Sequence, residues 1–233
     1  MKKLLNDKNF IFLTAIFLFF FGELFQLIPI EILNLNIDTI SINTTLLLKL
    51  FSSLVSVLIL VLIFYDGLKK DFVEFKKNKL TLFDTSFKIW CVGLILMALF
   101  NTIINYFSPN NLANNEEAIR GYISASPYIM FINTAIMAPL VEELVFRKSF
   151  RVMFKNKFAF ILISGLVFGA LHVIFSIENA YDYLYLLPYC SLGLAFSYMY
   201  YKTDNIWCPI TMHAIHNGIM TILNIISIGM MLW

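Results

Sequence analysis

The sequence predicts an all-α membrane protein, a polytopic bundle of about seven transmembrane helices. Of its 233 residues, 60% are hydrophobic and 14% are charged, whereas a soluble domain is about half apolar and a quarter charged. The mean hydropathy is +0.79. The apolar residues form long runs, and a membrane-spanning helix needs about 20 mostly apolar residues. We therefore expect a single membrane-embedded domain over residues 1–233.

Seven segments are long and apolar enough to span a bilayer. They are about Phe10–Ile30, Leu46–Phe64, Phe87–Phe107, Tyr128–Phe146, Phe158–Ile177, Tyr183–Tyr201 and Ile206–Trp233. The first follows a basic start like that of a signal peptide. Because it lacks a small-residue cleavage site, we expect it to be retained as a helix. The last segment could bend or split, which would give eight spans.

The basic residues lie mainly on one side of the predicted bundle. Lysine and arginine cluster in alternate loops, and Arg120 is the basic residue of the opposite loops. Since cytoplasmic loops carry the excess of Lys and Arg, we expect a cytoplasmic N-terminus and an outer C-terminus in a cell membrane. The cytoplasmic loops would be Asp66–Asn78, Arg151–Lys157 and Lys202–Asn205. The Phe-, Ile-, Asn- and Lys-rich composition is typical of a low-GC bacterium.

Charge and cysteine content exclude some partners. The net charge of +2 is too small to indicate nucleic-acid binding. The cysteines, Cys91, Cys190 and Cys208, have no metal-type spacing and lie in or beside apolar runs, so we interpret them as apolar packing residues. The expected partners are the lipid bilayer and a substrate, and the oligomeric state stays open.

Ionisable residues inside predicted spans are the candidates for function, because placing them in a bilayer is costly. They are Glu23 in the first span, Glu142 and Glu143 in the fourth, His172 in the fifth, and His213 and His216 in the seventh. Every histidine of the chain lies in the last three spans. This clustering indicates a shared site, although a single such residue often serves only to hold helices together. We expect that structural role for Glu23 and His216.

Helix geometry separates the two adjacent glutamates. Glu143 and Arg147 are four residues apart, so they share a helix face and can form an ion pair. Glu142 points about 100° away and has no partner on its own helix. Glu143 is therefore expected to support the site, and Glu142 is free for chemistry. Pro139 lacks an N–H and is expected to free the carbonyl of Ala135.

Two further helices can bring partners to Glu142. Glu142 and His172 lie at similar distances from Asn156, the centre of the turn between spans four and five, so both should sit at one depth. Phe168 is four residues before His172 and could pack against the imidazole. In span seven, His213 and Asn217 are four residues apart and share a face.

A carboxylate beside an imidazole in a water-poor cavity can take a proton from water. A second histidine and an amide donor could stabilise an oxyanion. This combination indicates hydrolysis of an acyl compound, most naturally a peptide bond. The sequence contains neither a G-x-S-x-G nucleophile elbow nor an H-E-x-x-H zinc helix.

Three motifs lie in order within a core of about residues 128–233: "EELVFR" fits E-E-x-x-x-R, "FGALH" fits F-x-x-x-H and "HAIHN" fits H-x-x-x-N. Together they resemble the motifs of the CAAX protease and bacteriocin-processing family, also called CPBP or Abi. The resemblance implies an intramembrane glutamic endopeptidase. Glu142 and His172 would activate water, His213 and Asn217 would take the oxyanion positions, and Glu143 and Arg147 would hold the site together. Many members have eight spans.

Several alternatives stay open on the sequence alone. The family has been described as metalloproteases, and Glu and His side chains could hold zinc, but Asn217 is an unusual ligand and we expect no cofactor. A non-enzymatic immunity or regulatory protein of the same fold is the second hypothesis, and a proton-coupled transporter is the third. For an endopeptidase, the substrate would be a peptide precursor or a membrane-tethered protein reached from the cytoplasmic side. The settings implied are bacteriocin processing or immunity, quorum-peptide maturation and prenyl-protein processing.

Overall fold

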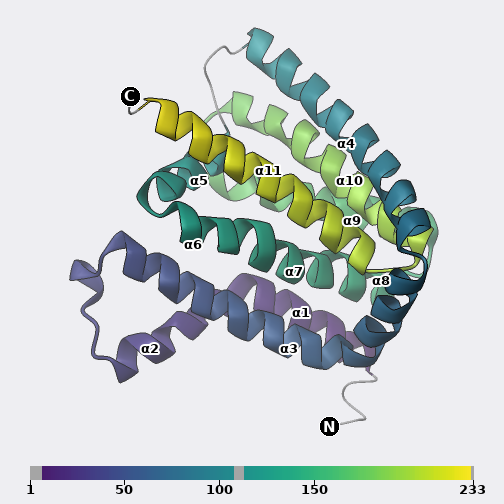
Figure 1. Cartoon of the computed structure of the whole chain (residues 1–233), viewed down its shortest axis with the longest axis horizontal. Helices are drawn as coiled ribbons and strands as arrows, with labels where there is room; N and C mark the ends of the chain where they lie inside the picture. Colours follow the sequence, from purple (N-terminus) through teal and green to yellow (C-terminus); the bar gives the residue numbers. More distant parts are fainter. Residues whose placement is uncertain (1–6, 108–112, 232–233) are drawn as a thin grey trace.

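The computed structural model describes residues 7–107 and 113–231, and within these ranges it is helical without any strand (Figure 1). Five helical segments are long and apolar enough to cross a membrane: Lys8–Ile32, Ile42–Lys77, Lys79–Phe107, Pro127–Met153 and Lys157–Ser176. They correspond to the first five predicted spans. The expectation of an all-α, multi-pass membrane bundle is therefore confirmed.

The sixth and seventh predicted spans are the helices α10 (Leu186–Thr203) and α11 (Trp207–Met231). They are not among the five segments above, and both carry polar residues within their apolar sequence. Through its described residues α11 is one continuous helix, so the split that would give eight spans is not seen. Residues 232 and 233 of the predicted span, and Lys2 and Lys3 of the basic N-terminus, lie outside the described residues.

The second and third spans are longer than predicted. Helices α3 (Ile42–Lys77) and α4 (Lys79–Phe107) are separated only by Asn78, so the expectation of a loop over Asp66–Asn78 is wrong. The charged residues of this stretch continue the helix instead of ending it, since lysine and glutamate are good helix formers. The backbone N–H of Asn78 closes the helix on the carbonyl of Glu74 at 3.0 Å.

The other short elements complete the chain path. Helix α1 (Lys8–Phe21) continues through the 3₁₀ segment η2 (Gly22–Gln26) into α2 (Leu27–Ile32), and η3 is Ile37–Thr39. A polar helix that the sequence analysis treated as a loop, α5 (Asn114–Ala125), joins the third and fourth spans. Two 3₁₀ segments, η6 (Ile174–Ser176) and η7 (Ala180–Tyr185), precede α10.

The fourth span is a row of helical pieces that lies between α3 and α11 (Figure 1). It consists of α6 (Pro127–Ile132), the π-helical segment η4 (Asn133–Met137), α7 (Ala138–Glu142), the π-helical segment η5 (Glu143–Ser149) and α8 (Phe150–Met153). A π-helical turn inserts a residue into the α-helical register and is frequent at functional sites. Both π-helical segments lie next to the candidate residues.

Helix α9 (Lys157–Leu171) packs tightly on α10 through small residues. Asn156, at the predicted turn, caps its first backbone N–H groups. A Cβ atom on Gly169 would lie 2.6 Å from the backbone of Cys190, and one on Gly165 would lie 2.8 Å from the backbone of Leu194. The spacing Gly-x-x-x-Gly therefore lets the two backbones touch, as in other membrane helix pairs.

A polar cluster ties the ends of three spans together at the basic side. Lys148 of η5 forms an ion pair with Asp71 of α3 at 2.5 Å. Asn205, in the turn between α10 and α11, donates a hydrogen bond from Nδ2 to the carbonyl of Asp71 at 2.6 Å. The indole N–H of Trp207 donates to the carbonyl of Leu68 at 3.1 Å. These contacts set where α11 begins and hence where its histidines lie.

The close contact of α9 and α10 predicts that Gly169→Ala lowers thermal stability. The added methyl group meets backbone, which cannot move out of the way, so we expect a loss of about 1–3 kcal/mol from overpacking. Gly229→Ala in α11 is the matched control, since a Cβ there has no atom within 4 Å. Melting curves of both purified variants would test this, and equal melting temperatures would contradict the packing argument.

Candidate active site

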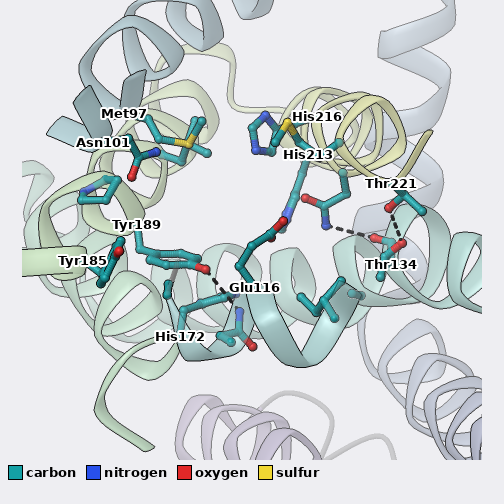
Figure 2. A pocket seen from close by; sticks show the side chains of 18 of the residues that line it. Met97, Asn101, Glu116, Thr134, His172, Tyr185, Tyr189, His213, His216 and Thr221 are labelled. Atoms are coloured by element: carbon teal, nitrogen blue, oxygen red, sulfur yellow. Dashed lines mark hydrogen bonds between the residues drawn. The ribbon is translucent and has the colours of Figure 1, made fainter. Parts of the chain in front are cut away.

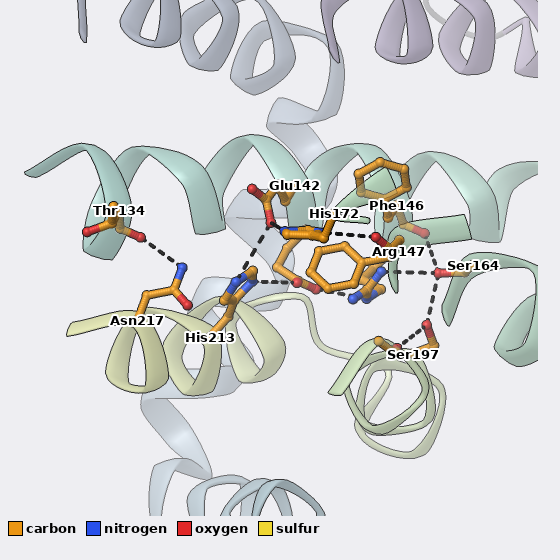
Figure 3. A network of polar contacts seen from close by, with 12 residues as sticks. Thr134, Glu142, Phe146, Arg147, Ser164, His172, Ser197, His213 and Asn217 are labelled. Atoms are coloured by element: carbon orange, nitrogen blue, oxygen red, sulfur yellow. Dashed lines mark hydrogen bonds and ion pairs between the residues drawn. The ribbon is translucent and has the colours of Figure 1, made fainter. Parts of the chain in front are cut away.

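Three helical rows bring the predicted residues to one place (Figure 3). Glu142 ends α7 and Glu143 begins η5, so they are consecutive residues at the junction of two segments of the fourth span. His172 is the residue that ends α9, and α11 carries His213 and Asn217. Except for the buried Glu143, these residues line one cavity of about 450 Å³.

A buried ion pair lies at the base of this cluster. Arg147 Nε lies 3.0 Å from Glu143 Oε2, and both side chains are 0% exposed. The two atoms make a close ionic contact without the angles of a hydrogen bond. The guanidinium also lies over the ring of Phe168 at 4.5 Å, a favourable cation–π distance. The i, i+4 contact expected from the sequence is therefore present.

Glu143 also contacts the histidine of a different helix. Its Oε1 lies 2.8 Å from His213 Nδ1. An ionised carboxylate only accepts hydrogen bonds, so His213 Nδ1 must carry the hydrogen. This leaves Nε2 of His213 facing the cavity side, where Glu142 lies. Glu143 thus positions His213 as well as Arg147, a connection that helix spacing alone did not reveal.

The carboxylate of Glu142 faces two imidazoles. Its Oε2 lies 3.7 Å from His213 Nε2 and 4.0 Å from His172 Nε2. This oxygen is buried and has no hydrogen-bond partner within the described part of the chain. His172 Nδ1 lies 2.9 Å from the carbonyl of Phe168, and since a carbonyl only accepts, Nδ1 carries the hydrogen. The Nε2 lone pair of a neutral His172 is therefore free to accept a proton beside Glu142.

Charge balance adds a constraint on this cluster. Glu142 and Glu143 contribute two negative charges and Arg147 one positive charge. Uncompensated charge is costly in a low-dielectric interior. One proton held among Glu142, His172 and His213 would make the group neutral. The arrangement is therefore suited to holding and moving a single proton.

Asn217 is held by a backbone carbonyl that the π-helical register sets free. In η4 the N–H of Ala138 bonds to the carbonyl of Asn133, five residues back. The next donor in this register would be residue 139, which is proline and has no N–H. The carbonyl of Thr134 instead accepts a hydrogen bond from Asn217 Nδ2 at 2.9 Å. The π-helical register thus makes the carbonyl of Thr134 available to Asn217, one residue before the carbonyl of Ala135 that α-helical spacing predicted.

The other candidates have different surroundings. The rings of Phe168 and His172 are 4.6 Å apart, as their spacing suggested. His216 lines the cavity, and its ring makes a T-shaped contact with Trp90 at 6.4 Å between centroids. Glu23 does not line this cavity: its side chain is 68% exposed and lies 3.8 Å from Lys49.

Two aromatic side chains that the sequence analysis did not single out orient the imidazoles. Tyr189 stacks on His172 with centroids 5.2 Å apart, and Phe196 stacks on His213 at 4.9 Å. Figure 2 shows Tyr189 beside His172 in the cavity. Both aromatic residues lie on α10. With 24 phenylalanines and 11 tyrosines in the chain, no sequence signal distinguished these two.

The same side chains are the candidates for a metal site that the sequence left open. Among the described residues, no group of three or more His, Cys, Asp or Glu side chains could hold a metal ion. The Nδ1 atoms of His172 and His213 are directed to Phe168 and Glu143. The polar atoms left toward the cavity are Oε2 of Glu142 and the two Nε2 atoms, which are separated by 3.7 and 4.0 Å from that oxygen.

Comparison with known proteins agrees with these observations. Residues 124–219 match the family model described as type II CAAX prenyl endopeptidase Rce1-like. Over these residues, the chain is similar to the CAAX prenyl endopeptidases that this model describes. This stretch contains all three motifs, and the resemblance inferred from them is confirmed. No solved structure matches the chain significantly.

Relatives support a membrane peptidase. YdiL of Bacillus subtilis, described as a candidate membrane peptidase, is 32% identical over 146 residues, 59% of this chain and 56% of that protein. The membrane-embedded CAAX protease MroQ of Staphylococcus aureus is 25% identical over 150 residues, 58% of this chain and 57% of that protein. YaiF of Lactococcus lactis is 26% identical over 231 residues, 94% and 98% of the two chains. The match thus spans little more than half the length of either named peptidase.

The buried ion pair predicts different effects for the two glutamates on folding. Glu143→Gln leaves Arg147 without its carboxylate, and breaking a buried pair costs about 3–5 kcal/mol. We expect a marked fall in melting temperature and yield. Glu142→Gln should melt close to the wild-type temperature, because the Oε2 atom has no hydrogen-bond partner to lose. Thermal unfolding of both variants in the same detergent is the measurement. Equal stability of the two variants would show that the Glu143–Arg147 pair does not hold the site together.

Proposed function

We propose that this protein is an intramembrane glutamic endopeptidase of the CAAX protease family. The observation that carries the proposal is the Glu142 carboxylate facing Nε2 of both His172 and His213 at the cavity wall. A water molecule between Glu142 Oε2 and His172 Nε2, which are 4.0 Å apart, could hydrogen bond to both. A carboxylate and an imidazole in this position act as a general base pair.

In the proposed reaction, Glu142 with His172 takes a proton from water as the oxygen attacks the peptide carbonyl carbon. The carbonyl oxygen becomes an oxyanion, which the second N–H of Asn217 Nδ2 and a protonated His213 would stabilise. The proton taken from water then passes to the departing amine as the C–N bond breaks. The products are a carboxylic acid and an amine, and the site returns to its starting protonation.

The substrate class that fits is a peptide precursor or a membrane-tethered protein. Bacteriocin processing and peptide maturation are the biological settings we favour, in the cell membrane of a bacterium. Both settings supply a short polypeptide at a membrane, which is where the cavity lies.

Replacement of the proposed base is predicted to abolish cleavage. Glu142→Gln keeps the side-chain shape but removes the base, and loss of a general base costs roughly 10²–10⁴ in rate. His172→Ala should have a similar effect. Asn217→Ala should lower kcat more than it raises KM, because the oxyanion forms only in the transition state. The measurement is peptidomics of cells carrying wild type or Glu142→Gln, followed by cleavage rates of the purified variants.

The controls distinguish the assignments. If Glu142→Gln keeps near-normal turnover while a folded Glu143→Gln is inactive, then base and supporting residue have been interchanged. If both variants keep full activity, or if peptides in the cell do not differ, the endopeptidase proposal fails. A non-enzymatic binding protein of the same fold would then be the better description.

We propose that the reaction needs no metal ion. The donor set supports this, since no group of three or more His, Cys, Asp or Glu side chains among the described residues could hold a metal ion, and Asn217 is an unusual zinc ligand. Activity should survive strong chelation, and elemental analysis of the purified protein should find no stoichiometric zinc. One zinc per chain, lost together with activity on chelation and restored with it, would reverse this conclusion.

The proposed orientation has the N-terminus and the basic ends of α3, α8 and α10 in the cytoplasm. In this orientation α5 lies on the outer side, and the cavity reaches residues of α5. This favours entry of the substrate from the outer side over the cytoplasmic access we expected. Labelling of single cysteines near Asn78 and in α5 should mark Asn78 from inside and α5 from outside. External labelling at Asn78 would invert the arrangement.

A further inference from the structure

A set of asparagine side chains lines the cavity beyond the proposed catalytic residues. Asn101 and Asn105 are one turn apart on α4, and Asn217 and Asn224 are two turns apart on α11. These two helices form facing walls of the cavity, and Figure 2 shows Asn101 across it from the α11 residue Thr221. The polar lining thus continues from the proposed oxyanion position at Asn217 away from Glu142.

The asparagine amides differ in whether they form hydrogen bonds within the protein. Asn217 donates to Thr134, and Asn224 Nδ2 donates to Glu116 Oε1 at 3.1 Å. Within residues 7–107 and 113–231, the amides of Asn101 and Asn105 have no hydrogen-bond partner in the protein. Asn101 is half-buried, and Asn105 is exposed near the end of α4. The two α4 amides therefore offer donors and acceptors to whatever fills the cavity.

The dimensions of this part of the cavity suit a short stretch of extended peptide. The seven residues from Asn217 to Asn224 rise by about 10 Å along a helix. An extended chain rises by about 3.3 Å per residue, so this length holds about three residues. Each residue of such a chain exposes one N–H and one C=O. An asparagine side chain can accept a hydrogen bond from the N–H through its oxygen and donate one to the C=O through its nitrogen.

Charge at the far end of the cavity is balanced within the protein. Arg120 Nε lies 3.0 Å from Glu116 Oε1, and the same oxygen accepts from Asn224. The end of the cavity is thus polar and electrically neutral. An isoprenoid chain placed there would cover the amides without pairing them, which is unfavourable.

We propose that Asn101, Asn105 and Asn224 form a subsite for the backbone of an unlipidated peptide segment about three residues long, adjacent to the bond to be cleaved. The proposal rests on the endopeptidase function for the position of that bond. It assigns an unmodified peptide, and not a prenyl chain, to this part of the cavity.

The test is a selection for binding that does not need catalysis. Full-length Glu142→Gln protein in lipid nanodiscs is incubated with a random decapeptide library, and retained peptides are identified by mass spectrometry. The selection is repeated with two further proteins that also carry Glu142→Gln. One adds Asn101→Leu together with Asn105→Leu, and the other adds Asn224→Leu. Thr102→Leu is the matched control, because Thr102 is an exposed neighbour on α4 that does not line the cavity. A second library carries a central cysteine with or without a farnesyl group.

We expect the asparagine variants to retain at least tenfold less peptide, and the Thr102→Leu variant to match its parent. Melting curves establish whether each variant is folded. If the α4 double variant is unfolded, the test uses peptide retention by the Asn224→Leu variant and by a single Asn101→Leu variant. Three results would overturn the inference. The folded asparagine variants could retain as much peptide as the parent, the parent could retain none, or farnesylated peptides could be retained preferentially. If peptides are retained as expected but wild type cleaves none of them, the subsite stands and the endopeptidase proposal fails.

Discussion

The structure depends on one buried charge cluster, the contact of Glu143 with both Arg147 and His213. Both members of the ion pair are fully buried. The free-energy cost of removing two charges from water is recovered only when the ion pair has good geometry and further contacts stabilise it. Here the compensation comes from two other helices, α9 and α11. His213 belongs to α11, while Phe168 and Ser164 of α9 contact the guanidinium, Ser164 Oγ at 3.4 Å from Nη1. Satisfying this one pair therefore fixes how α9 and α11 sit against the fourth span.

Irregular helical geometry allows the fourth span to carry polar contacts inside the bundle. Non-helical or strained backbone is tolerated at membrane depth where it faces protein or a cavity. The segment η4 places a proline where the next hydrogen-bond donor is due, which frees the carbonyl of Thr134 for Asn217. The segment η5 begins at Glu143 and carries Arg147 in a fully buried position. The two π-helical segments flank Glu142, so the proposed base lies between two places where the α-helical register changes.

The packing of α9 on α10 connects the fold to the orientation of the imidazoles. Gly165 and Gly169 bring α10 against α9, and α10 then supplies Tyr189 and Phe196 to the faces of His172 and His213. Rings clamped in this way have little rotational freedom, and their Nδ1 atoms are held by an oxygen acceptor. Each Nε2 atom is therefore presented to Glu142 before any substrate binds. Such preorganisation is what electrostatic stabilisation of a transition state requires.

The sequence by itself determined the membrane class, the helical fold and the cluster of Glu142, His172, His213 and Asn217, because apolar run length and helical spacing are local properties. It also determined the pairing of Glu143 with Arg147. Only the tertiary structure decided that Glu143 holds His213, that Thr134 holds Asn217, and that asparagines of α4 and α11 share a cavity. The stacking of Tyr189 on His172 could not be predicted, since it depends on contacts between segments distant in the chain. The continuous helix across Asp66–Asn78 follows instead from local helix propensity, which the interpretation of its charges as a loop missed.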